Sequence, residues 1–245
     1  MVLKYQGMKN LFKNPKTRKR NLILAILPFV IIASICGFIA FKSVSSISGN
    51  AEGTSKDSYK DSIDSMDYHL RSNATKYQTE LFKDLTKAVE DGSDKYEIAR
   101  LVAENYVADF YTWSNKDGTY DVGGMYYVYS PQKTTIYTQA RNTYYKYVSY
   151  YINQFGAKNL LEVENITSTL GDKVGTYEFE GKKYDSYFVT CEWTYKNEDT
   201  FKNVSITGYD SSNNPFVADE FVKKENFTII EKDGRFEIVQ AYGDN

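Results

Sequence analysis

The sequence predicts an α+β domain that a single N-terminal helix anchors in a membrane. Three observations lead to this prediction: an uncharged apolar run of 20 residues near the N-terminus, helical spacing of apolar residues as far as residue 155, and alternating apolar residues after Gly156. Helices followed by consecutive hairpin-linked strands are typical of helices packed on one face of a curved antiparallel sheet. We expect a tail (1–21), a transmembrane helix (22–41), a linker and stalk (42–75) and an exported domain (76–245).

The apolar run extends from Leu22 to Phe41 and contains no charged residue. At about 1.5 Å per residue it covers a hydrocarbon core of roughly 30 Å. Backbone polar groups in lipid must pair within the segment, so the run is predicted to be helical. A cleaved signal peptide is the alternative, but its apolar region is usually only about 7–15 residues long. Ile35 also precedes Cys36, where a lipoprotein signal would need a small residue, so an uncleaved anchor is favoured.

Charge is distributed unevenly along the chain. The first 20 residues contain seven Lys or Arg residues and no acid, whereas all 32 acidic residues and the other 23 basic residues lie further on, which gives that part a net charge of −9. Lys and Arg beside a span remain in the cytoplasm, so the domain is predicted to lie outside the cell membrane. Attraction to anionic lipids explains the tail. Docking to a cytoplasmic partner or to nucleic acid is the alternative, but with Tyr5 and Phe12 as its only aromatics the tail indicates no direct nucleic-acid binding.

The linker and the cysteines add two further expectations. Residues 42–56 are rich in Ser and Gly, which favours a flexible linker between membrane and domain. Cys36 lies in the predicted span and Cys191 is alone in the exported part, so that part cannot close an internal disulfide. Cys191 lies in an alternating stretch and is predicted to be a small buried side chain.

Two helices are predicted before residue 114. Apolar residues from Lys76 to Glu90 recur on one helix face, and Asp91-Gly92-Ser93 is typical of a helix end. Asp94 is predicted to cap the next helix, with Glu97 as its capping-box partner. That helix is expected to continue to Trp113. The more polar stretch 57–72 is interpreted as an extension of the first helix, which would form a stalk.

A loop and a third helix are expected next. Residues 114–132 are loop-like, and Gly123-Gly124 suggests special backbone angles or a close approach of two backbone segments. The pattern of a phosphate-binding loop is absent from this stretch. Residues 133–155 show three- and four-residue apolar steps and are predicted to form one helix that Gly156 ends.

The alternating pattern after Gly156 predicts antiparallel strands. The clearest runs from Tyr184 to Tyr195, with one apolar face. Asp233-Gly234 is a strong hairpin signal, and the segment Phe201–Pro215 is interpreted as a long loop. The other strands are expected around Leu161–Ile166, Val174–Phe179, Phe221–Ile230 and Phe236–Tyr242.

This pattern resembles the nuclear transport factor 2-like (cystatin-like) fold. The stretches that carry the likeness are Tyr96–Trp113, Met125–Tyr129, the helix ending at Phe155, and the strands from Tyr184 and Phe221. Such a fold behind one membrane helix is similar to the bitopic scaffold proteins of type IV secretion and conjugation machines, including those of Gram-positive conjugative elements. The resemblance implies a non-enzymatic assembly role with self-association and contacts to other channel components.

Few residues suggest catalysis. The single histidine, His69, lies in the polar stalk region, so the predicted core offers no histidine base. Clustered His and Cys residues that would favour a metal site are missing. The pairs Glu162/Glu164 and Glu178/Glu180 are typical of a solvated strand face. An apolar cone with an acid and a tyrosine would still allow isomerase-like chemistry, but no such pair stands out, so neither an enzyme nor a cofactor is expected.

Tyrosines are the most unusual feature, with 23 in the chain. Those on the apolar stripe of the third helix are interpreted as core residues. Tyr145 and Tyr150 fall off that stripe and are predicted to lie at a protein interface, because tyrosine combines an apolar ring with a polar tip. The nearby Tyr126, Tyr127 and Tyr129 are further interface candidates, and a glycan-binding surface is another interpretation.

Together these features predict a structural subunit of a type IV secretion or conjugative transfer channel. Its expected partners are the lipid bilayer, other channel subunits and further copies of itself. The alternative is a membrane-anchored cell-surface binding or accessory protein with a ligand-binding cone.

Overall fold

The computed structural model describes residues 60–172, 174–179, 181–204, 206–209, 215–218 and 221–243, with backbone alone for 206–209 and 215–218. The predicted tail (1–21), membrane span (22–41) and Ser/Gly-rich linker (42–56) lie outside these residues. Among the helices of the described ranges, none is both long and apolar enough to cross a membrane.

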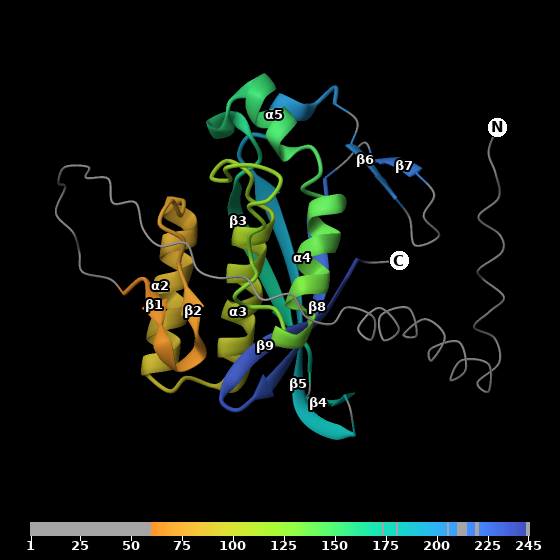
Figure 1. Ribbon diagram of the computed structural model, residues 1–245. Coiled ribbons are helices and arrows are strands. Elements are labelled where there is room, and N and C mark those ends of the chain that lie inside the picture. The colour runs from red at the N-terminus through yellow and green to blue at the C-terminus, as the bar shows by residue number, and fades with distance from the viewer. Residues whose placement is uncertain are drawn as a thin grey trace, which may run out of the picture. The chain divides into compact units, whose positions relative to one another are not determined.

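A five-stranded antiparallel sheet forms the centre of the described domain, which confirms the α+β class (Figure 1). The strand order is β3-β5-β8-β9, and β4 pairs with the outer part of β5. Val128 extends the sheet beyond β9 through a parallel bridge to Ile238. The strands are β3 (Val163–Leu170), β4 (Gly175–Phe179), β5 (Lys182–Tyr195), β8 (Lys224–Lys232) and β9 (Arg235–Tyr242).

Strand β5 places its apolar side chains on one face, as its alternation predicts. Five alternate residues of this strand are almost completely buried, and Cys191 among them is a free thiol with no exposed surface. Burial raises the pKa of the Cys191 thiol far above its usual range, so the side chain is inert. The buried residues are Tyr187, Val189, Cys191, Trp193 and Tyr195.

Helices α2 (Lys76–Glu90) and α3 (Lys95–Phe110) lie side by side, and α3 packs on the sheet (Figure 1). Asp94 caps α3 as predicted, since its carboxylate accepts from the Tyr96 N–H at 2.8 Å. The predicted capping-box role of Glu97 is wrong, because its carboxylate pairs with Arg100 instead. The capping box occurs at α2, where Thr75 and Gln78 bond reciprocally.

The stretch interpreted as a helical stalk forms a small hairpin. Strands β1 (Ser62–Ile63) and β2 (Tyr68–His69) flank the turn η1 (Asp64–Met66). Tyr68 is fully buried and its hydroxyl donates to the carbonyl of Phe236 in β9. The stalk prediction is therefore wrong for these residues, because one buried ring ties the hairpin to the core.

The third predicted helix is divided into α4 (Lys133–Asn142) and α5 (Val148–Phe155). The Tyr145 N–H turns back to the carbonyl of Ala140 at 2.9 Å, so the intervening residues form turns. A continuous helix would direct neighbouring side chains about 100° apart. At this break Tyr145 fills the core and Tyr144 packs against it.

Two turn predictions have opposite outcomes. Asp233 and Gly234 have φ values of 52° and 79° and join β8 to β9 in the predicted hairpin. The segment Phe201–Pro215, interpreted as a long loop, instead contains strand β6 (Ile206–Tyr209). This strand pairs with β7 (Pro215–Ala218), which begins where the segment ends, and the short helix η4 (Glu198–Phe201) ends where the segment begins.

Candidate functional site

Two cations and two carboxylates form a cluster that we call the ion-pair cluster: Arg71, Asp109, Lys116 and Asp121. Arg71 contacts Asp109 (Nε to Oδ1, 3.0 Å) and Asp121 (Nη2 to Oδ1, 2.7 Å). Lys116, whose side chain is completely buried, contacts the same Asp109 oxygen at 3.0 Å. The four formal charges cancel, so each buried ion has a partner of opposite sign.

The Gly123-Gly124 pair holds the backbone close to this cluster. A Cβ atom on Gly123 would lie 2.2 Å from the carbonyl oxygen of Asp109, and Gly124 has a φ of +77°. The Gly124 N–H donates to Asp109 Oδ2 at 2.7 Å. Burial alone would raise the pKa of Asp109, but Lys116, Arg71 and this N–H outweigh burial and keep the pKa below its usual value. The predicted close approach is confirmed.

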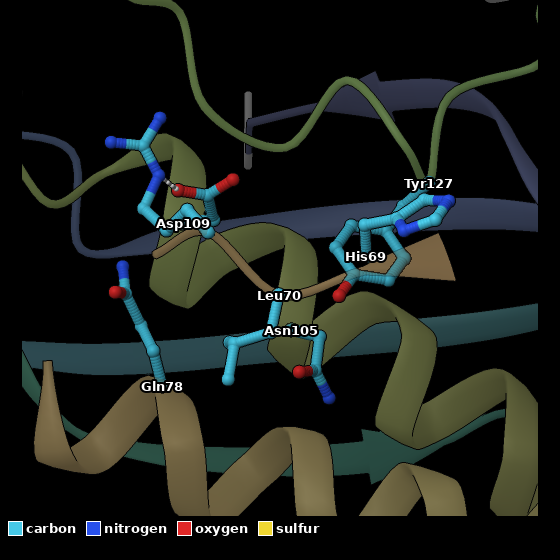
Figure 2. Close-up of a pocket in the computed structure, with 7 residues that line it drawn as sticks. His69, Leu70, Gln78, Asn105, Asp109 and Tyr127 are labelled. Carbon is cyan, nitrogen blue, oxygen red and sulfur yellow. Dashed lines mark ion pairs between the residues drawn. The ribbon is translucent and has the colours of Figure 1, made fainter. Parts of the chain in front are cut away.

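A small pocket lies beside Asp109 (Figure 2). Its volume of about 10 Å³ suffices for one water molecule but not for an organic substrate. The amide of Gln78 in its wall is bonded at both ends, donating to Ala108 O at 2.8 Å and accepting from Asn115 Nδ2 at 2.8 Å. The lining residues are His69, Leu70, Arg71, Gln78, Asn105, Asp109 and Tyr127.

The chemistry of the ion-pair cluster is consistent with a structural role. Lys116 could act as a nucleophilic amine only if a substrate reached it, yet its side chain has no exposed surface. Within the described ranges, no group of three His, Cys, Asp or Glu side chains is placed to hold a metal ion. The cluster joins the segment between β2 and α2, the C-terminal part of α3 and the loop that follows α3.

A second carboxyl group lies among aromatic side chains. Glu225 of β8 accepts a 2.6 Å hydrogen bond from the Tyr111 hydroxyl at the end of α3. Burial raises the pKa of Glu225 to about 7, and the Tyr111 bond offsets part of this increase. The sequence allows an acid–tyrosine pair of this kind but does not identify one. The two residues are 114 positions apart, so local sequence gives no sign of their contact.

Glu225 predicts a specific dependence of stability on pH. Because the pKa is higher in the folded protein than in the unfolded chain, the folded state holds this proton more tightly, and stability falls as pH rises from about 4.5 to 7. With a folded pKa near 7, the loss reaches about 3 kcal/mol.

Glu225→Gln keeps an acceptor for Tyr111 and removes the ionisation. Denaturant unfolding should therefore show the variant gaining about 3 kcal/mol over the wild type between pH 5 and 8, whereas parallel pH curves would contradict the shift.

The predicted interface tyrosines divide into buried and exposed residues. Tyr145 is completely buried, and its hydroxyl donates to Phe110 O at 2.6 Å and accepts from the Gly123 N–H at 3.1 Å. Tyr127 and Tyr129 are each only 4% exposed. The interface prediction is wrong for these three side chains, because they fill the interior. Tyr150 and Tyr126 are 58% and 43% exposed and remain available.

Tyr150 belongs to a surface that we call the tyrosine–cation strip, formed by α4, α5 and the loop 117–121. Its parts are connected: the Tyr137 hydroxyl donates to Tyr120 O at 2.8 Å, and the Thr119 N–H donates to Ser149 Oγ at 2.9 Å. Tyr120 has the most exposed large aromatic side chain in the part of the chain that the structure describes, at 61%. The strip consists of Tyr120, Tyr137, Arg141, Lys146, Tyr147 and Tyr150.

The sequence contains a signal for this strip that periodicity did not show. Between Val122 and Leu161 there are four basic residues, nine tyrosines and no Asp or Glu. A stretch of 40 residues without an acid is conspicuous, because the chain after residue 20 is otherwise acidic. The ion-pair cluster left no comparable signal, since Arg71 and Asp109 come together only through the tertiary fold.

Comparisons of the chain with protein-family models, with curated proteins and with solved structures find no match. Two regions of this chain are relevant to function: the ion-pair cluster, which joins three segments of the fold, and the tyrosine–cation strip, which exposes aromatic and cationic side chains.

Proposed function

We propose that the protein is a membrane-anchored assembly subunit that acts through protein–protein contacts made by the tyrosine–cation strip. The observation that supports this most strongly is the exposure of Tyr120 and Tyr150 on a surface whose segments are held together by hydrogen bonds. Tyrosine is enriched at protein interfaces because it buries a large ring while its hydroxyl remains hydrogen-bonded.

The hydrogen bonds that hold this surface together favour binding, because a flexible loop would have to be ordered when a partner docks. The loop carrying Tyr120 is tied to α4 by the Tyr137 hydroxyl and to α5 by Ser149. Thr119 Oγ1 also contacts Lys146 O at 3.4 Å. A surface held in place before binding loses less conformational freedom when a partner docks.

The more specific proposal is a subunit of a type IV secretion or conjugative transfer channel. In this proposal the span 22–41 anchors the chain, the basic tail lies in the cytoplasm, and the domain is exported as a nuclear transport factor 2-like unit. The α+β order of helices before an antiparallel sheet supports this proposal. The partners would be the bilayer, other channel subunits and further copies of the chain, without an enzymatic reaction.

The competing proposal of a ligand-binding cone requires a cavity that accepts a ligand. The pocket beside Asp109 has room for about one water molecule, and the Gln78 amide in its wall is already hydrogen-bonded to Ala108 and Asn115. Protein contact therefore has the stronger support.

A crosslinked pull-down of the full-length protein from native membranes, with mass spectrometry of the captured proteins, tests the proposed function. We expect secretion ATPases and channel subunits to be recovered, and Tyr120→Ala/Tyr150→Ala to reduce their yield severalfold. A control variant, Lys83→Ala/Asp84→Ala on the exposed face of α2, should leave the yield unchanged. Recovery of the protein alone, or only with wall glycans, would contradict the assembly role and favour the surface-binding alternative.

A further inference from the structure

The tyrosine–cation strip has a charge opposite to that of the exported chain around it. Arg141 and Lys146 are both exposed, and no acid occurs between Val122 and Leu161. The acids that flank this stretch are Asp121 and Glu162, and Asp117 at the start of the adjoining loop is an exposed acid. Glu162 is paired with Lys196 at 3.3 Å. Asp121 is paired with Arg71 and also accepts a hydrogen bond from the Asp117 N–H at 3.0 Å. Its negative charge is therefore compensated within the ion-pair cluster.

Each exposed cation of the strip lies against a tyrosine ring. The Arg141 guanidinium is 5.8 Å from the centroid of Tyr137, and the Lys146 ammonium is 5.0 Å from the centroid of Tyr147. Cation–π contacts of this kind hold the charged groups near the rings. A partner that meets the strip therefore encounters fixed positive charges separated by apolar rings with hydroxyl tips.

We propose that the tyrosine–cation strip docks an acidic protein surface, an inference that rests on the proposed assembly function and adds the chemistry of the partner. Charge complementarity supports an acidic partner, because complementary potentials steer association and disfavour partners of like charge. Arg and Tyr are also the residues enriched at protein interfaces.

Nucleic acid and anionic lipid are less suitable partners. The affinity for nucleic acid increases with the number of phosphates that cations neutralise. The two exposed cations of the strip would neutralise few phosphates. Binding to a lipid surface is strengthened by a buried apolar face together with clustered basic residues, whereas the strip exposes polar-tipped tyrosines.

The test uses the full-length chain in phosphatidylcholine nanodiscs with an environment-sensitive dye on Asn153→Cys, an exposed position of α5. The dye reports binding at the strip, and the buried Cys191 does not react. The probe is poly-L-glutamate. We expect Arg141→Glu/Lys146→Glu to raise the half-saturating probe concentration about tenfold. Each exposed charge contributes modestly to the binding free energy, and the two reversals together correspond to about a tenfold change in affinity. The matched control Lys76→Glu/Lys87→Glu on α2 changes the net charge equally and should stay within about twofold.

Several outcomes would overturn the acidic-partner inference. These are no dye response to poly-L-glutamate, equal losses in both double variants, or tighter binding of an oligothymidylate or of phosphatidylglycerol vesicles than of poly-L-glutamate. A separate comparison distinguishes this failure from failure of the assembly role. Equal capture of channel subunits from native membranes by the wild type and by Arg141→Glu/Lys146→Glu would leave the assembly role standing while the acidic partner is rejected.

Discussion

Asp109→Asn should lower the free energy of unfolding by about 3–5 kcal/mol, because it removes the carboxylate that neutralises the completely buried Lys116 ammonium. Asp109 contacts both Arg71 and Lys116 at 3.0 Å, and the Lys116 side chain has no exposed surface. The amide fits the same space and can still accept the Gly124 N–H, so the loss reports charge rather than shape. Denaturant unfolding of the full-length protein in neutral detergent can be followed through Trp113 and Trp193, the two tryptophans of the chain, which are both buried.

Two further variants make this result specific to the ion-pair cluster. Asp84→Asn removes an exposed carboxylate of α2 and should change stability by less than about 0.5 kcal/mol. Asp109→Asn/Lys116→Met leaves Arg71 paired with Asp121 and should recover much of the loss, as expected for coupled residues. If Asp109→Asn costs less than about 1 kcal/mol, the cluster does not have the role described.

Tyr145→Ala should be the second severe change, with a loss of about 3–5 kcal/mol typical of a large buried aromatic side chain. The ring is fully buried beside Phe110 and Tyr144, with centroids 5.5 and 5.6 Å away. The hydroxyl has two partners in the interior, Phe110 O and the Gly123 N–H. Tyr145→Phe should therefore cost about 1–3 kcal/mol by leaving them unsatisfied.

Tyr150→Ala provides the matched control for Tyr145, because it removes the same side chain from an exposed site on α5. It should change stability by less than about 0.5 kcal/mol. The same unfolding measurement applies to all three tyrosine variants. Equal losses for Tyr145→Ala and Tyr150→Ala would contradict the assignment of one ring to the core and the other to the surface.

Elements with a long and regular pattern could be predicted from the sequence. The bounds of α2 agree with the predicted Lys76–Glu90, and β5 alternates as predicted, because one face of each element packs on the core over many residues. The Asp233-Gly234 turn could be predicted since its residues tolerate positive φ. Local chemistry is sufficient in these cases.

Other features depend on contacts that local patterns do not show. Strands β1 and β2 have only two residues each, too few for a periodic signal, and Tyr68 holds them through a contact with Phe236. The break between α4 and α5, marked by the Tyr145 N–H bond to Ala140 O, interrupts a stretch whose apolar spacing continues as in a single helix. The candidate site also depends on tertiary contacts. Composition could have indicated the tyrosine–cation strip, but only the structure distinguishes the exposed Tyr150 from the buried Tyr145.

The proposed function depends above all on the tyrosine–cation strip being a protein-contact surface. The most direct measurement places a photo-crosslinking amino acid at position 150 of the full-length protein, and separately at position 84 on the exposed face of α2, in native membranes. We expect light-dependent protein adducts from position 150 and none of comparable yield from position 84. Adducts from position 84 alone, or no protein adduct from either position, would contradict the claim.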